Sequence, residues 1–251
     1  QEKTRFVVLN HASNVTGTVQ TVSDLGAEIR RRGAFLLVDA AQSAGVIPVK
    51  IDSLNADMIA CAGHKGLYGL PGTGGLVIGE RIKKLRSWRQ GGTGYNSQSE
   101  YQPSNWPEAF EAGTINMPGI ISIGCGIEFI EEQGLDKITS RKLQHIEYLW
   151  DHLSEIEGIR LYGPEPNDNR VAVLSLNVAG WEPDDIANIL QHNYNIQVRS
   201  GLHCAPLAHK TLGTFPEGTV RISPGYFTKA DELKQVIQAF KNLAVTRVVA
   251  S

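Results

Sequence analysis

An acid and a lysine each follow a short apolar run in the first part of the chain. Asp39 ends the run Leu36–Val38, and Lys65 comes soon after the run of residues 58–62. A lysine amine can form a Schiff base with an aldehyde cofactor, and a carboxylate can hold a pyridine nitrogen protonated. Open α/β sheets bind ligands at the loops that follow their strands. With Gln42 in the loop after Asp39, the spacing predicts a pyridoxal phosphate site.

Each of these residues also has an ordinary structural explanation. A loop lysine is usually solvated, an aspartate at a strand end often makes a turn, and a glutamine there can be a surface residue. Lys65 lies in an otherwise apolar, glycine-rich turn, where burial of the ammonium would lower its pKa. Because imine formation needs the unprotonated amine, the combination favours a reactive lysine.

A second reactive group is predicted in the loop of residues 199–206. Cys204 follows His203 directly, and Arg199 lies a few residues upstream. An adjacent imidazole and a nearby guanidinium can favour the thiolate, which is the nucleophilic form of sulfur. The alternative is an inert loop cysteine. The other two cysteines, Cys61 and Cys125, lie in apolar or helical runs and are expected to be small core residues.

Further polar residues could bind anions. Asn14 follows a predicted strand and could equally be a turn residue. Arg221 is a lone cation in a β-branched strand; facing inward it would suit a carboxylate, and facing outward it would be solvated. The glycines of 91–94 and the Gly113-Thr114 pair could let backbone amides approach a phosphate, although such pairs are more often turns. No histidine or cysteine spacing is typical of a zinc site, so no metal is predicted.

The elements that must position these residues alternate between strand and helix in the first half. Continuous apolar strands that alternate with helices indicate a parallel sheet covered by helices on both faces. After residue 134 the pattern indicates a smaller α+β unit, so we expect two domains, 1–134 and 135–251. The predicted strands are 6–9, 34–38, 57–62, 74–78, 171–176, 196–198 and 219–222. The predicted helices are 18–32, 120–132, 135–156, 183–191 and 228–245, and residues 86–118 are expected to form a long loop.

Composition sets loose limits on function. The chain has 251 residues, a formal net charge of −2 and 41% apolar residues, which is ordinary for a globular protein. The charge gives no support for nucleic-acid or anionic-membrane binding, and no apolar run is long enough to span a bilayer. Three widely spaced cysteines indicate no disulfide framework, so a reducing cytoplasm is expected. The polar start predicts no signal peptide, and the missing initiator methionine indicates that something upstream is absent.

Several of these segments together resemble a known family. They match the class V (fold type I) pyridoxal-phosphate-dependent aminotransferases, in the cysteine desulfurase and selenocysteine lyase branch. The resemblance spans nearly the whole chain, and the cysteine loop is similar to the desulfurase pattern Arg-x-Gly-x-His-Cys-Ala. The segments that carry it are Asn14, Val38–Gln42, Gly63–Gly69, Phe110–Thr114 and Arg199–Ala205.

The resemblance implies a role for each cofactor-site residue. Lys65 would form the Schiff base with pyridoxal phosphate and later act as acid and base at the substrate Cα. Asp39 would pair with the pyridine nitrogen, Gln42 with the ring 3-oxygen and His64 with the phosphate. Thr114 would reach the phosphate of the partner subunit's cofactor, which implies a homodimer.

The resemblance also implies how substrate is held and used. Asn14, beside the cofactor, and Arg221 would hold the substrate carboxylate, with Arg199 nearby. Cys204 would attack the substrate sulfur, keep it as a persulfide and release alanine, before passing it to a possible sulfur-acceptor protein. L-Cysteine is therefore the expected substrate and selenocysteine the alternative.

The sequence also departs from the family pattern. Ala62 stands where a serine or threonine often helps to bind the phosphate. The amino-terminal part of the cofactor domain, with its phosphate-binding Gly-Thr loop and a histidine that stacks on the pyridine, is absent; His11 is not that histidine. The leading hypothesis is a cysteine desulfurase. The alternatives are a selenocysteine lyase or other class V aminotransferase or lyase, and a truncated, non-catalytic dimerisation or binding domain.

Overall fold

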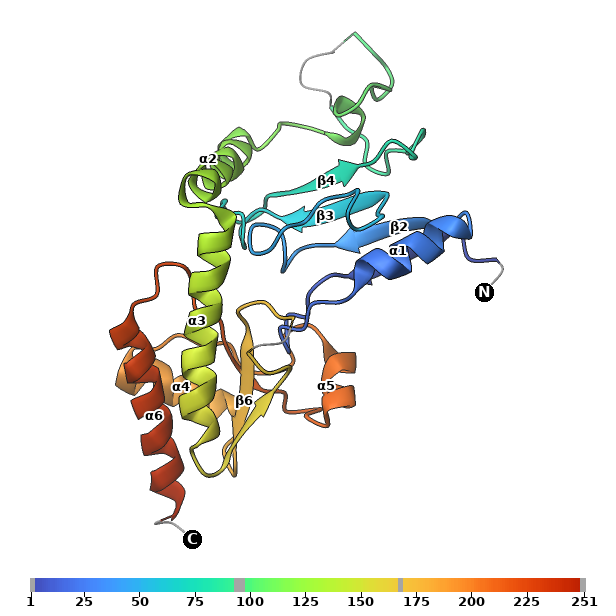
Figure 1. Cartoon of the computed structure of the whole chain (residues 1–251). Coiled ribbons are helices and arrows are strands. Elements are labelled where there is room, and N and C mark those ends of the chain that lie inside the picture. Colours follow the sequence, from blue (N-terminus) through green and yellow to red (C-terminus); the bar gives the residue numbers. More distant parts are fainter. Residues whose placement is uncertain (1–2, 93–97, 167–168, 249–251) are drawn as a thin grey trace.

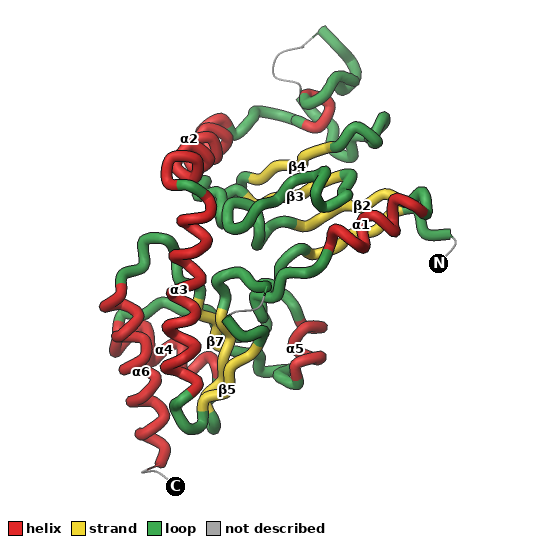
Figure 2. The backbone as a smooth tube through the Cα atoms, viewed as in Figure 1, coloured by secondary structure: helices red, strands yellow, loops and turns green. Residues whose placement is uncertain are grey.

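The structure is a computed structural model that describes residues 3–92, 98–166 and 169–248. It contains two separate sheets, joined by a long helix and by loops (Figures 1 and 2). The strands are β1 Phe6–Asn10, β2 Phe35–Asp39, β3 Met58–Ala62, β4 Gly74–Ile78, β5 Ile159–Tyr162, β6 Leu174–Val178 and β7 Val220–Ile222. The helices are α1 Val22–Arg31, η1 Glu108–Phe110, α2 Met117–Gln133, α3 Leu135–Ser154, α4 Pro183–Tyr194, α5 Pro206–Leu212 and α6 Ala230–Val248.

The first sheet has the order β1-β2-β3-β4, and its first three strands are parallel, as the continuous apolar runs predict. Strand β4 runs antiparallel to β3. The two strands are connected by residues 63–73, and the Gly63 amide at one end of this loop donates to the Thr73 carbonyl oxygen at the other end at 2.9 Å. A parallel neighbour would need a longer crossover connection, so this edge of the sheet is antiparallel.

Helix α1 covers one face of the first sheet and lies alongside β2 in Figures 1 and 2. Its Val22 packs with Leu36 and Val38, which point to the same side of β2 because they are two residues apart. On the opposite face, the β1 side chains Phe6 and Val8 are exposed. The α1 side of the sheet therefore forms the core of this part of the molecule.

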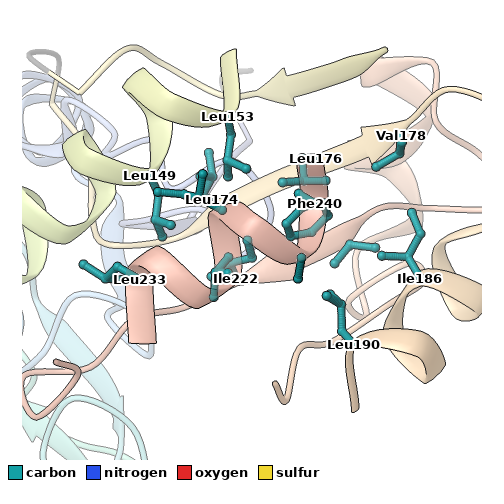
Figure 3. Packing of buried hydrophobic residues seen from close by; sticks show 14 of the residues in the cluster. Leu149, Leu153, Leu174, Leu176, Val178, Ile186, Leu190, Ile222, Leu233 and Phe240 are labelled. Atoms are coloured by element: carbon teal, nitrogen blue, oxygen red, sulfur yellow. The ribbon is translucent and has the colours of Figure 1, made fainter. Parts of the chain in front are cut away.

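The second sheet is antiparallel, with the order β5-β6-β7. Along β6, Leu174, Leu176 and Val178 are buried against α3, α4 and α6, together with Phe240 (Figure 3). Full burial of one such apolar side chain contributes roughly 1.5–3 kcal/mol to stability. The intervening Ser175 points to the other face, where its hydroxyl donates to the carbonyl oxygen of Val15 at 2.6 Å. The first sheet's loops therefore contact the side of this sheet that the helices leave open.

One helix and one strand begin later in the chain than predicted, because the residues before them make tertiary contacts. The helix predicted from residue 18 begins only at Val22, because Thr18 and Val19 pair as isolated bridges with Arg170 and Ala12. The strand predicted from residue 171 begins at Leu174, because the Val171 amide instead donates to Gly17. Both segments are used to join the two halves of the molecule.

One further prediction about the second half is wrong, and two short elements were not predicted. Residues 196–198 form no strand, and the residue that follows them, Arg199, makes an isolated bridge with Arg221 of β7. Strand β5 and the short helix α5 were not predicted. At the start of α6, the Glu232 carboxylate accepts a hydrogen bond from the Lys229 amide at 2.7 Å.

Asn116 caps the start of helix α2, and its side-chain oxygen accepts from the Gly119 amide at 3.2 Å. It carries exposed apolar side chains at Ile120 and Ile121. Cys125, on the same helix, is exposed, so the prediction of a core cysteine is wrong there. In the described part of residues 86–118, regular structure is limited to η1 and the start of α2, and none of the described helices is long and apolar enough to cross a bilayer.

Candidate functional site

Lys65 lies in a tight turn directly after β3. The Tyr68 amide donates to the Lys65 carbonyl oxygen at 3.1 Å, and Tyr68 has a positive φ of 56°. The turn presses against the loop after β2: a Cβ on Gly66 would lie 2.3 Å from the Ala44 carbonyl oxygen. A glycine is therefore required next to the lysine. The Lys65 side chain is exposed, so the prediction of a buried ammonium is wrong.

Asp39 ends β2, beside the strand that leads to Lys65. Its side chain is half-buried, and its Oδ1 accepts from the Ala41 amide at 2.9 Å. Its backbone carbonyl oxygen accepts from the His11 amide at 2.9 Å, which ties the ends of β1 and β2 together. The carboxylate therefore has a defined orientation before any ligand binds.

A cleft of about 310 Å³ separates the loops of the first sheet from β7 and the start of α3. Three residues predicted from the sequence line it: Gln42, Lys65 and Arg221. Lys142 and Tyr68 also line it. The remaining lining residues are Val46, Gly66, Val171, Ala172, Val173, Ser223, Pro224 and Gly225.

Two residues that line this cleft carry a buried hydrogen-bond donor without a partner. The Tyr68 hydroxyl and the Arg221 Nε are buried and have no hydrogen-bond partner. Burial lowers the pKa of Arg221 and of Lys142, and burial together with Tyr226 raises the pKa of Tyr68. No Asp or Glu is among the described residues that line the cleft. Unpaired buried donors and cations are costly, so the cleft suits a ligand with phosphate and carboxylate groups.

Arg221 projects from the face of β7 that points away from the helices, because its neighbours Val220 and Ile222 are buried in the core. Its guanidinium donates to the backbone carbonyl oxygen of Asn14 at 3.0 Å. The Asn14 side-chain amide donates in turn to the His203 carbonyl oxygen at 2.6 Å. The structure thus brings Asn14 and Arg221 together at the junction of the two sheets.

The cysteine loop reaches this junction through Arg199. The backbones of Arg199 and Arg221 bond to each other in both directions, at 3.2 and 2.7 Å. The Arg199 guanidinium donates to Sγ of Cys204 at 3.5 Å, and the cysteine is exposed. His203 and Cys204 have positive φ angles of 51° and 60°. Two successive non-glycine residues in this region store strain, which is often found at functional sites.

The sequence predicted that the imidazole of His203 lies next to the thiol of Cys204, and this prediction is wrong. The side chain of His203 is buried, and its Nε2 hydrogen-bonds to Oγ1 of Thr219 at 3.0 Å. Burial and the charges of Arg221 lower its pKa to about 4, so the ring is neutral near pH 7. The guanidinium of Arg199 is the cation that contacts the sulfur. His203 instead anchors the loop to the segment before β7.

Other predicted residues lie away from the cleft. His64 and Thr114 are exposed, and neither lines it. The Gly113 amide donates to the Gly92 carbonyl oxygen at 2.7 Å, so these glycines bond to each other. Thr93 and Gly94 lie outside the described residues.

Sequence reasoning missed Lys142 and Tyr68. Tyr68 follows the Lys65 turn directly, so its position offered a signal. Its ring packs edge-on against Phe129 at 5.2 Å. Lys142 gave no signal, because a lysine on an amphipathic helix is usually a solvated residue.

Comparison with known proteins identifies the family that this chain matches and its relatives. The family model described as aminotransferase class-V matches residues 1–236. A probable cysteine desulfurase of Methanothermobacter thermautotrophicus is 37% identical over 247 residues, which is 97% of this chain and 61% of that protein.

Solved structures of cysteine desulfurases are also similar to this chain. The apo cysteine desulfurase of Thermococcus onnurineus NA1 superposes with a TM-score of 0.85 at 34% identity, over 96% of this chain and 60% of that one. The cysteine desulfurase CsdA (S-sulfonic acid) of Escherichia coli gives a TM-score of 0.88 at 25% identity, over 98% of this chain and 60% of that one. The chain thus spans about three fifths of the length of the proteins that it matches.

Proposed function

Because the chain belongs to the aminotransferase class-V family, we propose that the protein is a pyridoxal-phosphate-dependent cysteine desulfurase. It converts L-cysteine to L-alanine and transfers the sulfur to Cys204 as a persulfide. The observation that carries this proposal is the continuous connection from the cleft to the thiol. Arg221 lines the cleft, its backbone pairs with Arg199, and the Arg199 guanidinium contacts the Cys204 sulfur.

The cleft's donors fit the proposed cofactor. When bound, pyridoxal phosphate supplies an electron sink at the substrate Cα. We assign Lys65 to hold the cofactor and to move the proton at that carbon. Asp39 would pair with the ring nitrogen, Gln42 with the ring 3-oxygen and His64 with the phosphate. The orientation of the Asp39 carboxylate by the Ala41 amide supports its assignment.

The substrate's carboxylate is assigned to Arg221, Asn14 and the nearby Arg199. A guanidinium binds a carboxylate strongly because it can donate two parallel hydrogen bonds, and the unpartnered Nε of Arg221 is available for this. With the carboxylate held there, the substrate's sulfur is directed toward Cys204. The exposure of Cys204 and its contact with Arg199 support the role of nucleophile.

The sulfur-transfer step balances without an external oxidant. The Cys204 thiolate forms a bond to the substrate sulfur while the bond from that sulfur to the substrate Cβ breaks. The electron pair of the broken bond is protonated at Cβ, so the carbon is reduced to the methyl group of alanine. The two sulfurs are left as a persulfide on the enzyme, ready for an acceptor protein.

We also propose the division into domains 1–134 and 135–251, and a homodimer. Gly134, with φ of 83°, separates α2 from α3 at the proposed boundary. Thr114 is exposed, and the exposed Ile120 and Ile121 follow it on α2. A partner subunit that binds to that surface would cover the apolar side chains, and Thr114 would then reach the cofactor of the partner subunit.

The test is alanine production from L-cysteine in the presence of pyridoxal phosphate. It is run on these 251 residues and on the longest natural form of the protein, because the matched relatives are longer. Cys204→Ala should abolish alanine release and the persulfide mass on the peptide of residues 199–206. Cys125→Ala, which removes another exposed thiol, should change neither.

Two results would redirect the proposal. Alanine release from L-cysteine at the wild-type rate in Cys204→Ala would remove the thiol from the mechanism. Selenium release from selenocysteine by that variant would then favour a selenocysteine lyase. If both forms of the protein lack the absorbance band near ~420 nm that pyridoxal phosphate imines give, and Lys65→Ala changes nothing, a non-catalytic binding domain is supported instead.

A further inference from the structure

Lys142 is a cation of the cleft that the proposed function does not use. It lies on α3 and lines the cleft together with Lys65 and Arg221. The residue three positions earlier, Thr139, donates its hydroxyl to the carbonyl oxygen of Val46, which lines the same cleft. Residues three apart on a helix share a face. The contact of Thr139 therefore docks this face of α3 against the loop after β2 and holds Lys142 at the cleft.

The surroundings of Lys142 leave its charge without compensation. Its side chain is half-buried, and burial lowers its pKa below the ordinary lysine value. The ion pairs found in the described residues are Arg31–Glu28, Arg32–Glu28, Arg81–Asp57 and Lys234–Asp231, so none involves Lys142. A half-buried ammonium that lines the same cleft as the half-buried Arg221 and has no carboxylate partner favours a ligand with an anionic group.

We propose that Lys142 is a second cation for the substrate's α-carboxylate and acts together with Arg221. The inference rests on the proposed function for the identity of the substrate. The chemistry that it requires is that of a small amino acid with a free carboxylate. Tyr68 lines the same cleft, and its buried, unpartnered hydroxyl offers a further donor.

The test compares Lys142→Ala and Lys142→Arg with wild type, all loaded with pyridoxal phosphate. Loss of a hydrogen bond from a charged donor weakens binding by about tenfold or more. Lys142→Ala should therefore raise KM for L-cysteine by about tenfold with little change in kcat, because the contact exists before and during reaction. Lys142→Arg, which keeps a cation, should restore most of the loss.

A matched control and a modified substrate separate charge recognition from structural damage. Lys137→Ala removes an exposed lysine from the same helix that does not line the cleft, and should leave KM unchanged. L-Cysteine methyl ester has no carboxylate charge, so wild type and Lys142→Ala should use it equally well. An equal loss with cysteine and its ester would overturn the proposal.

A binding measurement distinguishes failure of this inference from failure of the proposed function. Calorimetric titration with L-alanine, the proposed product, should give a dissociation constant about tenfold larger for Lys142→Ala than for wild type. If wild type releases no alanine from cysteine but this difference is seen, the desulfurase function fails and the role of Lys142 stands. If both proteins bind L-alanine equally, or neither binds it, the role assigned to Lys142 is wrong.

Discussion

The side-chain amide of Asn14 donates a hydrogen bond to the backbone carbonyl oxygen of His203 at 2.6 Å. One residue belongs to the loop after β1, and the other immediately precedes the proposed nucleophile Cys204. The bond therefore ties the cysteine loop to the first sheet. It also engages the amide that we assign to the substrate's carboxylate, so substrate would compete with the loop for the same donor.

Asn14→Ala should loosen the cysteine loop. Loss of one such hydrogen bond costs about 1 kcal/mol, which corresponds to roughly fivefold faster amide hydrogen exchange at residues 201–205 if they exchange by local opening. Mass spectrometry of the corresponding peptides measures this. Gln235→Ala is the control, because it removes a similar bond to the Tyr194 carbonyl oxygen elsewhere. Equal exchange in Asn14→Ala and wild type would show that the bond does not hold the loop.

Arg199→Ala should slow alkylation of Cys204 by iodoacetamide near pH 7 by about three- to tenfold. The physical reason is that a positive charge near sulfur stabilises the thiolate, which is the reactive form. The exposed Cys125 serves as an internal reference in the same molecule. Peptide mass spectrometry follows both sites. Equal slowing of alkylation at both cysteines, or no slowing at either, would show that the contact with Arg199 does not control the reactivity of Cys204.

His203 should make stability depend on pH. Its pKa is lowered from 6.5 to about 4 in the folded state, so the unfolded chain binds the proton more tightly. Stability from the neutral ring is present above pH 6.5 and is lost as pH falls from 6.5 toward 4. Between pH 7 and pH 5 the loss amounts to about 2 kcal/mol.

The variant His203→Asn isolates this contribution, because asparagine tolerates the positive φ and does not titrate. Urea unfolding at the two pH values should give a stability advantage of wild type over the variant that shrinks by about 2 kcal/mol at pH 5. An advantage that stays constant with pH would show that the buried ring does not titrate as inferred.

Gly218→Ala should destabilise the protein more than Gly33→Ala. Both glycines have positive φ, 84° and 71°. A Cβ at Gly218 would lie 2.2 Å from the backbone carbon of Gly201 in the cysteine loop, whereas nothing lies within 4 Å of one at Gly33. We expect about 1 kcal/mol for Gly33→Ala and more than about 2 kcal/mol for Gly218→Ala. Urea unfolding measures the loss of stability in both variants. Equal losses would mean that the cysteine loop shifts easily to accommodate the added methyl group.

Local patterns predicted the elements whose burial is regular. The apolar runs before Asp39 and Lys65 are strands of one sheet, as predicted, although β2 is fully buried only on the face that α1 covers. The segments at Thr18 and Val171 were predicted less well. Their hydrogen bonds go to partners more than a hundred positions away in the chain. Such partners override local propensity and leave no periodic signal.

Residue types at short spacings were enough to predict the family, the order of the reactive residues and the strands that carry them. The folded structure was needed to show that Arg221 faces the junction of the sheets, that His203 turns away from the thiol and that Lys142 lines the cleft. Those outcomes depend on which face of a strand, loop or helix packs against a distant segment. Burial and pairing between remote parts of the chain set that choice.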